Sequence, residues 1–108
     1  MKDDRVYLGH IRDAINDIEQ YTAGGRDAFM ADRMQQDAVI RKFEIIGEAV
    51  KHLSKVTTQR RPDIEWRRIA GMRDRLTHDY LGVDLVLVWT AIERDISKLR
   101  SAVETLLS

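Results

Sequence analysis

Residues 85–106 carry apolar side chains at a nearly regular helical spacing, and this pattern limits the folds open to the chain. The steps between successive apolar residues alternate between four and three positions, so all of them share one face of an α-helix. These residues are Leu85, Trp89, Ile92, Ile96, Leu99, Val103 and Leu106. Asp84 stands directly before the run and can cap the helix. A seam of this length has to be buried against other helices.

Two more segments carry apolar stripes at the same three- and four-residue steps. One covers residues 4–21, and the other covers residues 32–53, whose apolar positions extend over more than one face. The second segment is therefore predicted to be a central helix. Gly47 lies inside it, where glycine costs roughly 1 kcal/mol relative to alanine. Close approach of another helix is the simplest compensation. A short helix is predicted around residues 27–30.

The remaining segments predict a loop and a fourth main helix. Residues 54–62 have no apolar periodicity and end at the only proline, so they are expected to form the main loop. Asp63 can cap a helix over residues 64–77, and Gly82 interrupts the pattern before the last helix. The predicted fold is all-α: an antiparallel bundle of four main helices plus a short one, forming a single domain over residues 1–108.

Composition excludes several classes of protein. The chain has no cysteine, so disulfides and thiolate metal sites are ruled out. Neither a signal-peptide pattern nor a membrane-spanning apolar run is found, and a cytoplasmic protein is expected. Net charge is zero overall but unevenly distributed. Residues 51–75 carry eight basic and three acidic side chains, whereas residues 1–50 carry seven and ten. This basic segment could attract phosphate, or its arginines could simply solvate a helix face.

The basic segment leads into an unusual polar stretch, MRDRLTHDY, at residues 72–80. At about 100° per residue, a continuous helix would place Arg73 within the apolar arc and His78 on the opposite side. An arginine near the core needs a partner, and Glu48 on the preceding helix is a candidate. Arg73 and His78 can meet at one atom only if the helix unwinds after Thr77 or if two subunits contribute to one site.

The residue types in this stretch suit metal-free phosphodiester chemistry. A histidine with an ordinary pKa near 6.5 can act as base or acid at neutral pH. An arginine can hold a phosphate with two hydrogen bonds and offset developing charge. The alternative is that Arg73, Asp74 and His78 only complement the carbonyl end of a helix. His10 and His52 are interpreted as structural, because neither has a partner at ligand spacing on a clear helix face.

The motif Arg73, four residues, His78, one residue, Tyr80 resembles the R-x4-H-x-Y motif of HepT-like toxins in the HEPN superfamily. Three longer segments resemble the same family in the same order. They are FEIIGEAVKHLS (43–54), PDIEWRRIAGMRDRLTHDY (62–80) and VDLVLVWTAIERD (83–95). The resemblance therefore covers most of the chain, and no motif position departs from the family pattern.

This resemblance implies a HEPN-like helical homodimer with its active cleft between protomers. It implies a metal-independent endoribonuclease without cofactors, with tRNA as one candidate substrate. Arg73 and His78 would be catalytic, and Asp74 supporting. Glu48, the candidate partner of Arg73, is expected to be a second supporting residue. It also implies a type VII-like toxin–antitoxin system, in which an MntA-like nucleotidyltransferase antitoxin transfers AMP to Tyr80.

Two other functions remain open at this stage. A helical dimer without catalytic activity could serve only as the binding partner of a nucleotidyltransferase. A helix-turn-helix DNA-binding protein would need a basic recognition helix with exposed polar residues near its start. The long regular helices on either side fit a bundle better than a helix-turn-helix.

Overall fold

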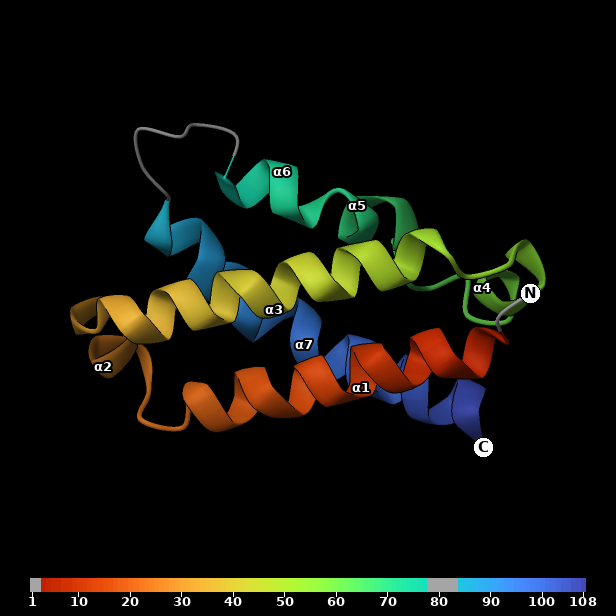
Figure 1. Cartoon of the computed structure of the whole chain (residues 1–108), viewed down its shortest axis with the longest axis horizontal. Helices are drawn as coiled ribbons and strands as arrows, with labels where there is room; N and C mark the ends of the chain where they lie inside the picture. The colour runs from red at the N-terminus through yellow and green to blue at the C-terminus, as the bar shows by residue number, and fades with distance from the viewer. Residues whose placement is uncertain (1–2, 78–83) are drawn as a thin grey trace.

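The computed structural model describes residues 3–77 and 84–108, and all regular secondary structure within these ranges is helical. The predicted all-α class is therefore confirmed. Three helices are long and four are short (Figure 1). In chain order they are α1 (Asp4–Tyr21), α2 (Arg26–Ala31), α3 (Arg33–Lys51), α4 (Lys55–Gln59), α5 (Trp66–Ala70), α6 (Met72–Thr77) and α7 (Leu85–Leu107).

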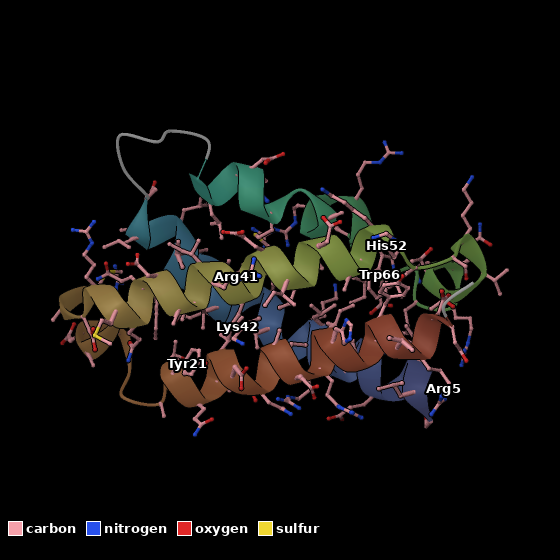
Figure 2. The ribbon with its side chains drawn as sticks, viewed as in Figure 1. Arg5, Tyr21, Arg41, Lys42, His52 and Trp66 are labelled. Atoms are coloured by element: carbon pink, nitrogen blue, oxygen red, sulfur yellow. The ribbon has the colours of Figure 1, made fainter. Side chains whose placement is uncertain are left out.

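Helices α1 and α3 lie side by side and antiparallel, with α5 and α6 along the other side of α3 and α7 behind them (Figure 1). The core is built from apolar residues that α1, α3 and α7 turn toward one another, including Ile11, Phe43 and Leu99. An ion pair of 2.8 Å between Lys42 Nζ and Asp17 Oδ2 joins α3 to α1 at the rim of this core. Lys42 is labelled in Figure 2. The three long helices therefore form the frame on which the short ones are held.

The predicted seam of the last helix is confirmed. Trp89, Ile96, Leu99, Val103 and Leu106 are buried, and the remaining two members are half-buried. The Asp84 carboxylate accepts a hydrogen bond of 3.1 Å from the Leu87 backbone N–H, as expected of an N-cap. The periodicity thus identified both the face and the start of α7.

The predicted loop over residues 54–62 is wrong in part, because it contains the short helix α4. The Ser54 hydroxyl caps this helix by accepting from the Thr57 backbone N–H at 3.3 Å. Ser54 also donates to the Asp4 carboxylate, which ties α4 to the start of α1. Helix α4 has no buried residue, so it carries no apolar stripe that a sequence pattern could reveal.

The single helix predicted over residues 64–77 is also wrong, since Gly71 separates α5 from α6. Asp63 does not cap this segment, because its carboxylate pairs with Arg61 at 2.8 Å. Helix α5 instead begins after Glu65, which makes no side-chain cap bond. The indole N–H of Trp66, a residue labelled in Figure 2, donates to backbone carbonyls of the preceding segment and fixes the entry to α5.

Gly47 lies where α3 passes the end of α5, as its position in the sequence predicted. A Cβ atom there would lie 3.1 Å from the Ala70 carbonyl oxygen and 3.3 Å from that of Ile69. Gly9 in α1 provides a matched comparison, because a Cβ there would meet nothing within 4 Å. The glycine therefore sets how closely α5 approaches α3.

Alanine at these two glycines is expected to shift stability in opposite directions. Gly9→Ala should raise the free energy of unfolding by up to about 1 kcal/mol through helix propensity. Gly47→Ala should lower it by up to about 2 kcal/mol, because crowding against fixed carbonyls outweighs that gain. Urea denaturation of the two variants measures the difference. Equal stabilisation by both would contradict the close packing of α3 and α5.

Candidate active site

The first half of the polar motif lies in α6. Met72 and Leu76 are buried, whereas Asp74 and Arg75 are exposed, so α6 is amphipathic. The side chain of Arg73, and His78 and Tyr80 in full, lie outside the described residues. The convergence of these three residues therefore stays a prediction.

The break at Gly71 changes the helical-wheel argument. That argument measured the direction of Arg73 from Ile69 as though both lay on one continuous helix. They lie on separate helices, α5 and α6, so the direction of Arg73 relative to Ile69 no longer follows from one continuous helix. Met72 and Leu76, predicted on the same apolar face as Ile69, are nevertheless buried as expected.

The expected pairing of Arg73 with Glu48 is likewise a prediction. Among described residues, Glu48 pairs with Lys51 at 3.8 Å and with His52 at 3.6 Å.

A pocket of about 750 Å³ lies beside the motif helix, lined from α1, α3, α5 and α6 and by the residue after α3, His52. It brings together Glu48 and Asp74, the two residues predicted to support catalysis. His10 also lines it. The pocket is large enough for a nucleotide-sized ligand.

His52 contacts two other residues of this lining. Its ring stacks on Tyr7, with centroids 4.8 Å apart and planes 12° apart. Its Nε2 lies 3.6 Å from the Glu48 carboxylate. Figure 2 shows His52 and Arg41 along the length of α3. These contacts place a titratable ring beside the motif helix.

The sequence interpretation missed this arrangement. Glu48 precedes His52 by four residues, which puts the two side chains on one helix face, and this signal was available. The stacking of Tyr7 on His52 joins residues far apart in the chain, and no periodicity indicates it. His52 is therefore a lining residue of the candidate site rather than only a helix-end residue.

The charge of the described lining is mixed. Three carboxylates, from Glu44, Glu48 and Asp74, face only two permanent cations, Arg41 and Lys51. With neutral histidines this lining is net negative. An anionic ligand would therefore depend on additional cations for attraction.

A buried ion pair fixes the segment that leads into α6. The Arg68 guanidinium on α5 hydrogen-bonds to the carboxylate of Asp95 on α7 and also to Glu65 at 2.6 Å. Asp95 is only 8% exposed. The hydrogen bond with Asp95 raises the pKa of Arg68 above its ordinary value, so the guanidinium stays charged. Sequence reasoning sought a core arginine at Arg73 and overlooked this one.

Among residues 3–77 and 84–108, no group of three or more His, Asp or Glu side chains is arranged to hold a metal ion. No helix within the same ranges combines the length and apolar character needed to cross a lipid bilayer.

Comparison with known proteins agrees with the motif. The family model "Ribonuclease HepT-like" matches residues 11–106. A protein of Thermococcus cleftensis, described as a candidate ribonuclease HepT, is 42% identical over 101 residues, which are 93% of this chain and 92% of that protein. A candidate ribonuclease of Caldanaerobacter subterraneus subsp. tengcongensis is 37% identical over 108 residues, 99% of this chain and 96% of that protein.

Another relative is longer. A protein of Methanocaldococcus jannaschii, whose name joins a gamma-glutamylcyclotransferase to a candidate ribonuclease, is 44% identical over 103 residues. These residues are 94% of this chain but 46% of that protein, so the chain spans about half of this relative. No solved structure gives a significant match. The family model covers most of the chain, and relatives of similar length match nearly end to end. The chain belongs to the HepT-like ribonuclease family.

Proposed function

We propose that this protein is an endoribonuclease toxin that acts as a cytoplasmic homodimer and cleaves RNA without a metal ion. The observation that carries the proposal is the complete motif of Arg73, His78 and Tyr80 within a chain that matches the family model over residues 11–106. Several relatives are described as candidate ribonucleases. Arg73 and His78 are the proposed catalytic residues.

The proposed reaction is an intramolecular transesterification. A neutral His78 removes the proton of the ribose 2′-hydroxyl, and the resulting oxyanion attacks the adjacent phosphorus. The bond to the 5′-oxygen breaks, and a protonated histidine gives that oxygen a proton. The products are a 2′,3′-cyclic phosphate and a 5′-hydroxyl. Arg73 stabilises the extra negative charge on the phosphoryl oxygens.

Two histidines are needed for this scheme, one as base and one as acid. A symmetric dimer would supply two copies of His78 to one cleft. Asp74 and Glu48 are proposed as supporting residues that orient the cationic groups. The pocket that both of them line, next to α6, supports this assignment.

Tyr80 is the proposed point of control. An MntA-like nucleotidyltransferase antitoxin would transfer AMP to its hydroxyl, as in a type VII-like toxin–antitoxin pair. Tyr80 is two residues from His78, so the added phosphate would bring negative charge and bulk to a phosphate-binding site. Modified protein is therefore expected to be inactive.

Cleavage is expected to persist in excess EDTA. Purified protein is incubated with total RNA and, separately, with tRNA, and the product ends are analysed. Products ending in a cyclic phosphate and a 5′-hydroxyl support the transesterification. If EDTA abolishes cleavage and added Mg²⁺ restores it, the metal-free scheme is wrong. If no RNA is cut under any condition but a nucleotidyltransferase still binds, the protein is the non-catalytic dimer instead.

A further inference from the structure

A second groove lies between the α5–α6 segment and α7. It consists of two adjoining hollows of about 130 Å³ and 30 Å³, both of which are lined by Arg68, Arg94 and Asp95. The first continues to Lys98, and the second continues to Arg75. It has no lining residue in common with the large pocket beside α1 and α3. The two surfaces are therefore distinct.

The free charge in this groove is positive. Arg75, Arg94 and Lys98 are exposed. None of them makes a hydrogen bond or ion pair with another residue in the described ranges. The acidic residues of the groove, Glu65 and Asp95, are both hydrogen-bonded to Arg68. Because Arg68 offsets only one of these two carboxylates, the three further cations give the described groove an excess of two positive charges, whereas the described lining of the larger pocket has an excess of carboxylates.

The spacing of these cations suits a polyanionic chain. Arg94 and Lys98 are one turn apart on α7, about 6 Å along the axis, which is comparable to the step between successive phosphates of a polynucleotide. Arg94 lines both hollows, so it stands between Lys98 at one end and Arg75 at the other. Arg75 comes three residues before His78 in the chain. Arg75 is therefore the member of this row nearest in sequence to the proposed catalytic residue.

We propose that the groove between α5–α6 and α7 binds the sugar–phosphate backbone of a single-stranded segment of the RNA substrate. This inference rests on the proposed ribonuclease function and adds a backbone-binding surface to it. Two exposed cations one turn apart on α7, with Arg75 at the other end of a narrow groove, fit phosphates better than a folded protein partner. The contacts would be independent of base sequence, because they reach only phosphates.

The test measures how RNA affinity depends on salt. The triple variant Arg75→Gln, Arg94→Gln, Lys98→Gln is compared with a control that removes three exposed cations at helix starts, Arg26→Gln, Arg33→Gln, Lys55→Gln. Both carry His78→Ala to prevent cleavage, and the probe is a single-stranded RNA oligonucleotide. For a single-stranded nucleic acid, each phosphate contact contributes about −0.7 to the slope of log K against log salt concentration. The slope for the groove variant should therefore be shallower by about 2 than the slope for His78→Ala alone. The slope for the control variant should be almost unchanged.

The outcomes separate this inference from the function on which it rests. Equal slopes for both triple variants would overturn the groove proposal, even if His78 proves essential for cleavage. Loss of nucleotidyltransferase binding without loss of RNA affinity would also overturn it. If the unmodified protein cuts no RNA but the groove variant alone loses affinity, the ribonuclease function fails and the RNA-binding groove stands. Circular dichroism confirms that each variant is folded.

Discussion

Replacing His78 by alanine is expected to slow RNA cleavage by about 10²–10⁴-fold, the range for loss of a positioned general acid or base. The expectation follows from the proposed chemistry, in which no other group of the motif titrates near neutral pH. The rate is measured under single-turnover conditions, so that product release does not mask the chemical step. Thermal unfolding of the variant serves to show that the fold is kept.

His10→Ala and His52→Ala are the matched controls for this prediction. Both histidines line the pocket beside the motif helix, but neither belongs to the motif. We expect each to change the cleavage rate much less than His78→Ala does. The assignment of His78 would be wrong if His52→Ala showed the large loss of rate expected of His78→Ala while His78→Ala cleaved like the unmodified protein. His52 would then be the catalytic histidine.

A mixed dimer tests whether two protomers share one site. One protomer keeps His78 and the other carries His78→Ala, and two different affinity tags isolate the mixed species. If one cleft uses both histidines, the mixed dimer should cleave nearly as slowly as the dimer with both substitutions. Half of the unmodified rate would show that each protomer has an independent site.

The long helices could be predicted from the sequence because each one satisfies a local rule. The apolar periodicity of α1 and α7 reflects one buried face, and Asp84 caps the helix that it directly precedes. The close approach of another helix at Gly47 could also be predicted, because glycine inside a helix is costly unless close packing requires it. These signals are contained within a few turns of chain, so no knowledge of tertiary structure was needed.

The segment before the motif could not be predicted in the same way. Residues 64–77 have an apolar pattern compatible with one helix, and only the packed structure shows the break at Gly71. Arg68 and Asp95 are 27 residues apart, so their pairing depends on how α5 meets α7. The stacking of Tyr7 on His52 depends in the same way on how α1 lies beside the end of α3. Contacts between residues so far apart in the chain produce no periodic pattern in the sequence.

Replacing Arg68 by alanine is expected to cost about 3 kcal/mol of unfolding free energy, the lower end of the range for breaking a buried ion pair by removing one partner. The Asp95 side chain is 9% exposed, and the Arg68 side chain is 24% exposed. The partial exposure of Arg68 reduces the cost. One carboxylate oxygen of Asp95 already has no hydrogen-bond partner in the described part of the chain. Without Arg68, the buried negative charge of Asp95 would lose the cation that it pairs with.

A second substitution distinguishes the buried charge from lost packing. Arg68→Leu combined with Asp95→Leu removes both charges and fills the site with apolar atoms, so it should recover most of the stability lost in Arg68→Ala. Glu65→Ala is the control for the exposed partner of Arg68 and should cost about 1 kcal/mol or less. Urea denaturation measures all three variants. A loss below about 1 kcal/mol for Arg68→Ala would mean that water screens the pair as it does on a surface. Helix α5 would then be held against α7 by its apolar residues alone.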